Sequence, residues 1–157
     1  MVATDPLVWL PFDPAELGET PSGLRYEVAV PDRSGSVPNS VGEVAFYVTP
    51  YRFAHHDYDF IDRAPALQVV QTLTAGVEHV QPLVPPHVTL CNGRGIHDSS
   101  TAELAVALIL ASLRGIPDFV RAQDRGVWSG QWRPALADTS VLIVGAGSIA
   151  HALATRL

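Results

Sequence analysis

The stretch near the carboxyl end constrains the fold most, because a buried strand, a glycine turn and a helix follow one another there. Residues 141–144 form a continuous apolar run, which predicts a strand buried on both faces, as in a parallel sheet. Gly145, Gly147 and Ala150 then complete the pattern Gly-x-Gly-x-x-Ala. Ile149, Leu153 and Leu157 then recur every four positions, which is the spacing of one helix face. The glycines therefore separate a strand from a helix.

A strand–turn–helix with these glycines is typical of dinucleotide binding. Gly145 permits the tight turn, Gly147 lets the backbone approach a pyrophosphate, and Ala150 is small enough for close packing of helix on strand. The helix amino end offers free N–H groups to phosphate. Two other interpretations remain open: a merely structural turn, or a loop for another nucleotide such as S-adenosylmethionine. The acidic residue that reads the ribose is expected about 20 residues further on, past Leu157.

Composition excludes several classes of protein. With 47% hydrophobic and 17% charged residues the chain is globular, and a net charge of −6 argues against a nucleic-acid surface. The single cysteine, Cys91, permits no internal disulfide and fits a reducing cytosol. The first residues lack the basic and apolar segments of a signal peptide, and the longest apolar run, 104–111, is too short to span a bilayer. We expect a cytoplasmic protein with neither membrane nor nucleic-acid partner.

The first part of the sequence reads as a doubly wound α/β domain with a parallel sheet. Apolar runs bounded by proline and glycine predict five strands, and the segments between them predict short helices, notably at 58–63. A helical turn is also expected at 15–17, after Asp13. The expected strands are residues 7–10, 24–30, 44–48, 67–71 and 88–91.

The strongest helix signal follows. Ser100 and Glu103 form a capping box, and only Glu103 and Ser112 are polar in 102–113. A helix that is apolar on nearly all sides is expected to be buried, here as a strut between domains or between subunits. Gly115 predicts its end, and Pro117 begins a second, more polar helix. In the loop that follows, Trp128 and Trp132 are expected to pack, with a subunit interface as the candidate place.

Two groups of residues near the third expected strand each allow a structural and a functional interpretation. His55, His56 and Asp57 suggest a metal site, but adjacent histidines on one loop point apart, so a solvated loop is favoured and no metal is expected. Arg52 follows the carboxyl end of a strand, the edge where α/β sheets place ligands. It is a candidate for a substrate carboxylate, although a surface arginine is the favoured alternative.

Four segments, in order, resemble the NAD-dependent D-2-hydroxyacid dehydrogenases, a family that includes phosphoglycerate dehydrogenases and glyoxylate/hydroxypyruvate reductases. Residues 72–80 (Thr-Leu-Thr-Ala-Gly-Val-Glu-His-Val) resemble the family's AGVDHVD segment. Residues 100–110 resemble its SVAELAVALLL helix, and 121–128 resemble the stretch after that helix. Residues 141–150 match its strand and phosphate loop. The first 66 residues match only in general pattern.

The resemblance implies a domain plan. Residues 1–95 would be a flavodoxin-like substrate-binding domain, 96–137 the interdomain and dimerisation helices with their loop, and 138–157 the start of a Rossmann domain for NAD or NADP. In the family, loop amides hold the substrate carboxylate, the glycine loop cradles the pyrophosphate and the linking helix starts beside the nicotinamide. By this resemblance, the amides of Ala75, Gly76 and Val77 would hold the substrate carboxylate in this chain. The pyrophosphate would lie on Gly145, Gly147, Ser148 and Ile149, and Thr101 would border the nicotinamide.

The resemblance also implies what is missing. The family's catalytic arginine, glutamate and histidine lie downstream of the phosphate loop, so none is assigned, and we expect an incomplete chain with no activity alone. The segment at 97–99 lacks the family's usual Asn-Ser pattern. The function expected of the parent protein is hydride transfer on D-2-hydroxy or 2-oxo acids in a homodimer joined through 99–135. The alternative is a non-catalytic flavodoxin-like domain that dimerises through its apolar helix.

Overall fold

The structure, a computed structural model, describes residues 5–52 and 54–157. They form two compact units, Met1–Ile96 and His97–Leu157. The first unit holds a five-stranded sheet, all parallel, in the order β2-β1-β3-β4-β5. This confirms the α/β fold class, and the order is that of flavodoxin-like sheets. The strands are β1 (Leu7–Leu10), β2 (Arg25–Val28), β3 (Val44–Val48), β4 (Val69–Gln71) and β5 (Thr89–Cys91).

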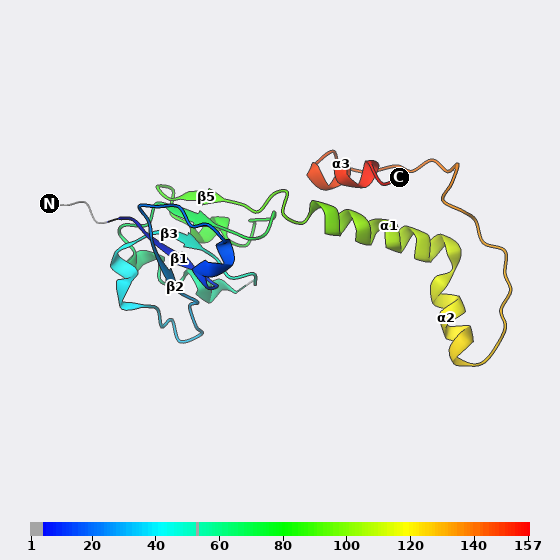
Figure 1. The fold of residues 1–157 in the computed structure, drawn as a ribbon, viewed down its shortest axis with the longest axis horizontal. Helices are drawn as coiled ribbons and strands as arrows, with labels where there is room; N and C mark the ends of the chain where they lie inside the picture. Colours follow the sequence, from blue (N-terminus) through cyan, green and yellow to red (C-terminus); the bar gives the residue numbers. More distant parts are fainter. Residues whose placement is uncertain (1–4, 53) are drawn as a thin grey trace. The chain divides into compact units, whose positions relative to one another are not determined.

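Short 3₁₀ helices connect the strands (Figure 1). The turn expected after Asp13 is present, and the Asp13 side chain accepts a hydrogen bond from the Ala15 amide at 2.9 Å. The prediction of a single helix at 58–63 is wrong, because two short 3₁₀ helices, η3 and η4, are formed in this part of the chain. Pro65 disfavours helical backbone at Ala64, which gives a longer helix no room to continue. The 3₁₀ helices are η1 (Pro14–Leu17), η2 (Asn39–Gly42), η3 (His55–Tyr58), η4 (Ile61–Arg63) and η5 (Gln81–Leu83).

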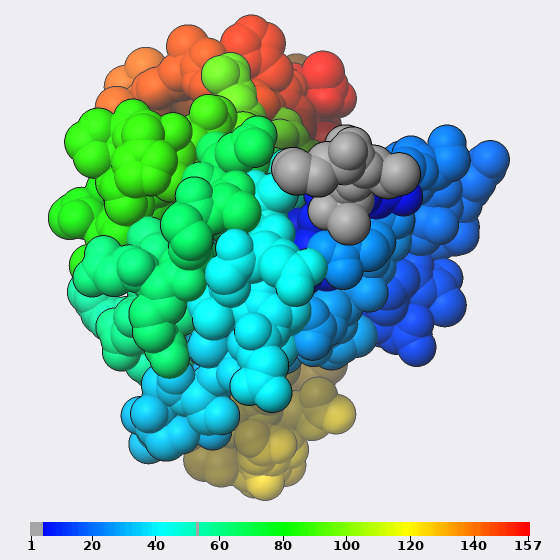
Figure 2. All heavy atoms as spheres, turned by 90° about the vertical axis from the view of Figure 1, so that its left-hand side faces the viewer, coloured from blue at the N-terminus to red at the C-terminus, as the bar shows by residue number. Residues whose placement is uncertain are grey.

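An aromatic cluster fills one side of the sheet. Trp9 and Tyr47 are opposite each other on β1 and β3, and Phe60 from the segment after β3 packs on both, with ring centroids 5.1 and 4.9 Å away. All three side chains are fully buried. Tyr58, Ile61 and Ala64, from the chain between β3 and β4, belong to the same buried cluster. Atoms coloured light blue to cyan make up a large part of the face shown in Figure 2. Because side chains alternate between the two faces of a strand, Trp9 of β1 and Tyr47 of β3 lie on the same face of the sheet.

The opposite side of the sheet carries an open apolar groove of about 470 Å³. Its floor is made by Val8, Leu10, Phe46 and Val48, which alternate with the aromatic cluster along β1 and β3. The segment after β1 adds part of the wall, including Leu17. The helical segments after β1 and after β3 therefore lie on opposite sides of the sheet, which makes the β1–β3 boundary the topological switch point.

The second unit is helical: α1 (Asp98–Arg114), α2 (Ile116–Asp124) and α3 (Ser148–Ala154). Gly115 ends α1 in a left-handed conformation with φ +65°, as its position predicted. The capping box is wrong, because α1 begins at Asp98. His97 is the N-cap residue, and no side-chain cap hydrogen bond is formed there. The Ser100 hydroxyl instead donates to the His97 carbonyl at 3.2 Å.

The strand expected at 141–144 is not formed in the structure. The segment has no regular secondary structure and pairs with no strand, and Leu142 and Val144 are 87% and 92% exposed. No strand lies in the described unit His97–Leu157, so the backbone groups of 141–144 have no ladder to join. The burial expected for α1 is likewise not met within the chain, since Leu104 and Leu108 are 59% and 61% exposed.

Candidate functional site

The loop after β4 is tied down by its own side chains. Thr72 is buried, and its hydroxyl donates to the Thr74 carbonyl at 2.8 Å. The Thr74 hydroxyl donates in turn to the Gly76 carbonyl at 2.8 Å. From β5, the Asn92 amide nitrogen donates to the Ala75 carbonyl at 3.0 Å. These bonds all engage carbonyl oxygens of the loop, so they fix its shape without using its N–H groups.

The amides of Ala75, Gly76 and Val77 are the groups predicted to hold a carboxylate. Within the described residues none of these three N–H groups donates a hydrogen bond to the protein. Ala75 and Gly76 are exposed, at the carboxyl end of a central strand. Consecutive free amides in such a turn suit an anion. The Glu78 carboxylate folds over Gly76, where a Cβ would lie 2.8 Å from Glu78 Oε2, so a bound anion has to displace it.

Gly93 is a site residue that the sequence did not reveal. A Cβ on Gly93 would lie 2.8 Å from both the carbonyl carbon and the oxygen of Leu73, which are backbone atoms that cannot move aside. The Gly93 amide also donates to the Thr74 carbonyl at 2.8 Å. The position of Gly93 directly after β5, next to the loop of the neighbouring strand, is the signal that could have found it.

Arg52 is engaged with the protein itself. Its Nε lies 3.0 and 2.9 Å from the two carboxylate oxygens of Asp57, and its Nη2 also bonds Asp57 and the Pro31 carbonyl. Asp57 is 1% exposed, so the expectation of a solvated loop at residues 55–57 is wrong for this residue. The buried carboxylate needs the arginine as its partner. The hydrogen bond to Asp57 is the main reason that the pKa of Arg52 is raised. A role for Arg52 toward substrate stays a prediction.

Tyr47 lies near this ion pair but does not hydrogen-bond to it. Its hydroxyl oxygen is buried and has no hydrogen-bond partner among the residues that the structure describes. Burial first, and then the negative charge of Asp57, raise the pKa of the Tyr47 hydroxyl well above its usual value. A buried carboxylate, Asp57, and a buried hydroxyl, that of Tyr47, thus lie close to each other beside the partly exposed Arg52.

The glycine loop has the backbone that its pattern predicts. Gly145 has φ +103°, and the space around a Cβ at Gly147 is open. A hollow of about 190 Å³ lies beside the loop, lined by Gly145, Ala146, Ala150 and neighbouring residues of α3. The first amides of α3 donate no hydrogen bond to a capping side chain and, as at any helix start, lack partners within the helix.

Three further predicted cofactor residues lie in α1 and α3. The Ser148 hydroxyl donates to the Asp98 carboxylate at 3.0 Å, so the loop is joined to the start of α1. Thr101 is exposed in the first turn of α1, and Ile149 is 36% exposed on α3. These placements are compatible with a phosphate loop, and the roles of these residues stay predictions.

No model of a known protein family matches the chain. It is 34% identical over 110 residues to the glyoxylate reductase/hydroxypyruvate reductase of Mus musculus, covering 64% of this chain and 33% of the mouse protein. It is 30% identical over 111 residues to the glyoxylate reductase of Thermofilum pendens, covering 64% and 32%. The matches thus span about a third of the length of these relatives.

Solved structures share the fold. A D-isomer specific 2-hydroxyacid dehydrogenase family protein from Aeromonas salmonicida superposes with a TM-score of 0.80 at 20% identity, covering 98% of this chain and 50% of that one. The enzyme from Xanthobacter autotrophicus, in complex with NADPH and MES, gives 0.74 at 24% identity, with the same coverage. The chain is related to the D-2-hydroxyacid dehydrogenases. The resemblance found in residues 72–80, 100–110, 121–128 and 141–150 is confirmed at the level of this family.

Across residues 5–52 and 54–157, no group of three or more histidine, cysteine, aspartate or glutamate side chains is placed to hold a metal ion. Within the same ranges, no helix is both long and apolar enough to cross a bilayer.

Proposed function

We propose that this chain provides the substrate-carboxylate loop and the phosphate loop of an NAD(P)-dependent oxidoreductase that acts on D-2-hydroxy acids and 2-oxo acids. The observation that carries the proposal is the set of three free amides at Ala75, Gly76 and Val77, on a loop held rigid through its carbonyl groups. The relatives named above are reductases of glyoxylate and hydroxypyruvate. Both compounds are small 2-oxo acids with the carboxylate that such amides would bind.

In this proposal the residues of the chain bind and orient the reactants. The amides of 75–77 hold the acid by its carboxylate and fix the direction of its C2 carbon. The nicotinamide cofactor, when bound, supplies or accepts the hydride. Its pyrophosphate would lie on Gly145, Gly147, Ser148 and Ile149, and Thr101 would border the nicotinamide. NAD and NADP both remain candidates. The proton donor and the arginine that polarises the carbonyl are not assigned within residues 1–157, so we expect this chain alone to be inactive.

The binding step can be tested on the chain as it is. Oxalate, a small dicarboxylate analogue of glyoxylate, is titrated into the ¹⁵N-labelled chain while the amide signals are followed by NMR. We expect saturable shifts at 75–77, and a separate titration with NADPH is expected to shift Gly145 to Ile149. Glu78→Gln should tighten oxalate binding, because the carboxylate folded over Gly76 is then neutral. Oxalate that leaves residues 75–77 unshifted up to millimolar concentration would contradict the carboxylate loop.

The catalytic part of the proposal has its own test. NADH or NADPH is mixed with glyoxylate or hydroxypyruvate and the chain, and the nicotinamide absorbance is followed. We expect no turnover. Turnover by the purified 157-residue chain would mean that acid–base residues lie within it, and that the assignment of the missing ones is wrong.

We also propose a homodimer joined through residues 99–135, in the cytosol. The exposed apolar side chains of α1, such as Leu104 and Leu108, favour an interface. The single cysteine, Cys91, is in keeping with a reducing compartment. The same exposed side chains keep the second candidate function open, a non-catalytic flavodoxin-like domain that dimerises through α1. Oxalate and NADPH binding separate the two, because a purely structural domain should bind neither.

A further inference from the structure

Asn92 and Gly93, directly after β5, form an asparagine–glycine pair beside the loop that carries the amides of 75–77. Asn92 is exposed and Gly93 is buried. In such a pair the backbone nitrogen of the glycine can attack the side-chain carbonyl carbon of the asparagine, because the glycine has no Cβ to hinder the closing ring. A glycine after an asparagine is therefore the neighbour that favours loss of the side-chain amide most.

Each member of the pair is required by the fold. Gly93 passes so close to the Leu73 backbone that an added Cβ would lie 2.8 Å from it. A larger residue, which would slow the ring closure, therefore has no room at this position. Asn92 supplies the amide nitrogen that donates to the Ala75 carbonyl at 3.0 Å. The packing that shapes the loop thus keeps a chemically labile pair next to it.

The hydrogen bonds of the pair control when it can react. The Gly93 amide donates to the Thr74 carbonyl at 2.8 Å, and the Asn92 side-chain nitrogen donates to the Ala75 carbonyl. Ring closure turns both nitrogen atoms away from these carbonyl groups, so both bonds must break first. The pair is therefore protected while the loop is closed and reacts through local opening.

We propose that Asn92 is a modification site, at which loss of the side-chain amide weakens anion binding by the neighbouring loop. The Gly93 nitrogen forms a bond to Cγ of Asn92, and the bond between Cγ and Nδ2 breaks. Nδ2 leaves as ammonia and takes the proton of the Gly93 N–H. Water then opens the cyclic imide at either of its carbonyl carbons, which leaves an aspartate or an isoaspartate at position 92.

The product opposes the role proposed for the loop, and this consequence rests on that proposed function. A carboxylate at position 92 cannot donate to the Ala75 carbonyl and repels it instead. That carbonyl shares its peptide group with the Gly76 amide, one of the three amides proposed to bind the substrate. Isoaspartate also lengthens the backbone where Gly93 packs against Leu73. A bound acid that keeps the loop closed should in turn slow the reaction.

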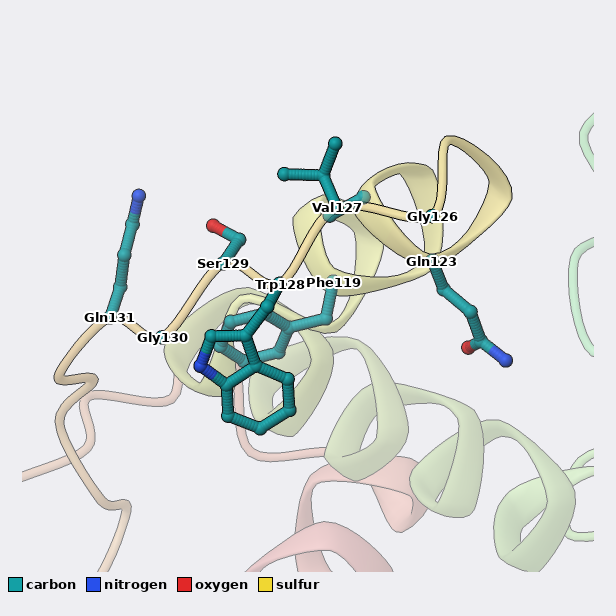
Figure 3. Close-up of a pocket in the computed structure, with 9 residues that line it drawn as sticks. Phe119, Gln123, Gly126, Val127, Trp128, Ser129, Gly130 and Gln131 are labelled. Atoms are coloured by element: carbon teal, nitrogen blue, oxygen red, sulfur yellow. The ribbon is translucent and has the colours of Figure 1, made fainter.

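The reaction is tested by incubating the whole chain at mildly alkaline pH and following its peptides by mass spectrometry. Asn39, the other asparagine of the chain, is also exposed and is followed by serine, so it is the matched internal control. Gln123 is a second control. It is exposed at the edge of the hollow in Figure 3, apart from the Trp128 indole, and its longer side chain would have to close a larger ring.

We expect Asn92 to lose its amide several-fold faster than Asn39, and Gln123 to stay unchanged. Saturating oxalate should slow the loss at Asn92 several-fold and leave Asn39 unaffected. A rate at Asn92 no higher than that at Asn39 would overturn the proposal. An equal rate with and without oxalate, when the amide signals of 75–77 show that oxalate is bound, would overturn the coupling of the reaction to the loop.

The effect on binding is measured with Asn92→Asp, which reproduces one product, and Asn92→Gln, which keeps an amide but removes the reactive pair. We expect Asn92→Asp to weaken oxalate binding roughly tenfold, because a hydrogen bond is lost and a like charge is added. Asn92→Gln should bind oxalate more tightly than Asn92→Asp, and circular dichroism checks that both variants fold. Unchanged binding by Asn92→Asp, or equal weakening in both variants, would overturn the proposed effect. If the parent chain binds no oxalate, the proposed function fails, whereas the loss of the amide at Asn92 is still measured by mass spectrometry.

Discussion

The two units differ in how much of their apolar surface their own residues cover. In the first unit Trp9, Tyr47 and Phe60 are fully buried against one another. In the second unit the buried apolar residues are two alanines, Ala102 and Ala122, while Trp128 and Val144 lie almost entirely in water. The first unit is therefore expected to derive its stability from its own core, whereas the helices of the second depend on local propensity and on whatever covers them.

The largest expected effect contrasts two tryptophans, one in each unit. Trp9→Ala removes a side chain at 0% exposure, together with its hydrogen bonds to Glu27 and Ser40. We expect it to lower the free energy of unfolding by about 3–5 kcal/mol. Trp128→Ala should change it by less than about 0.5 kcal/mol, because its side chain makes little contact within the chain. Urea unfolding followed by circular dichroism measures both. Similar losses for the two variants would remove the contrast between the units.

The next prediction concerns two glycines of the first unit. Gly93→Ala forces a Cβ against the Leu73 backbone, so strand ends and loop must separate. We expect a loss of about 1–3 kcal/mol in the free energy of unfolding, together with weaker oxalate shifts at residues 75–77. Gly42→Ala is the matched control, because nothing lies within 4 Å of its added Cβ. If Gly93→Ala leaves oxalate binding intact, the contact between Gly93 and Leu73 does not shape the anion loop.

The same comparison shows what could be predicted from sequence. The strands β1 and β3 were found because their apolar runs are bounded by local breakers, and α1 because its composition is that of a helix. Residues 141–144 carry an equally strong strand pattern, but they form no strand here. A helix satisfies its hydrogen bonds within one segment, whereas a strand needs a neighbour, and the apolar pattern of a segment does not say whether that neighbour is present.

In the candidate site, too, residues in short sequence patterns could be predicted, whereas residues that depend on tertiary contacts could not. The Ala75–Gly76–Val77 loop and the glycine loop were predicted because their short patterns resemble those of a known family, and their roles stay predictions. Gly93 and the Arg52–Asp57 pair were missed, since each depends on a contact that sequence spacing does not reveal. Gly93 approaches Leu73 across two strand ends, and Asp57 is buried although it lies in a polar stretch. Burial of a polar residue is set by the tertiary fold and by its partner.

A smaller effect is expected in the second unit, at the junction of α1 and α2. Gly115→Ala places a Cβ at φ +65° and only 2.5 Å from Arg133 Nε, so the arginine must leave its bond with Asp118. We expect a cost of about 1 kcal/mol from the backbone alone, seen as lower helical content by circular dichroism. Gly126→Ala has the same φ but open space around it, and should lose less. An equal loss would mean that the Arg133 contact adds nothing. The unfolding midpoint of the first unit should not move in either variant.

The smallest effect at neutral pH is expected for Tyr47→Phe, compared with Tyr58→Phe. The Tyr47 hydroxyl is buried without a hydrogen bond, so its removal should be neutral or stabilise the fold by up to about 1 kcal/mol. The Tyr58 hydroxyl is hydrogen-bonded to Thr49, and its removal should cost about 1 kcal/mol. Urea midpoints at neutral pH separate the two. A clear destabilisation by Tyr47→Phe would mean that its hydroxyl has a partner.

Alkaline pH should enlarge this difference. Burial raises the pKa of both Tyr47 and Tyr58 above the usual tyrosine value, so the folded chain keeps protons that the unfolded chain releases. That contribution is complete below the unfolded pKa near about 10 and is lost as the pH rises toward the folded value, which means that stability falls with pH in this range. Because Tyr47 is the more deeply buried of the two, Tyr47→Phe should remove more of the alkaline slope than Tyr58→Phe. Urea unfolding at several pH values measures the slope, and equal slopes in the parent chain and Tyr47→Phe would show that this buried hydroxyl does not link folding to pH.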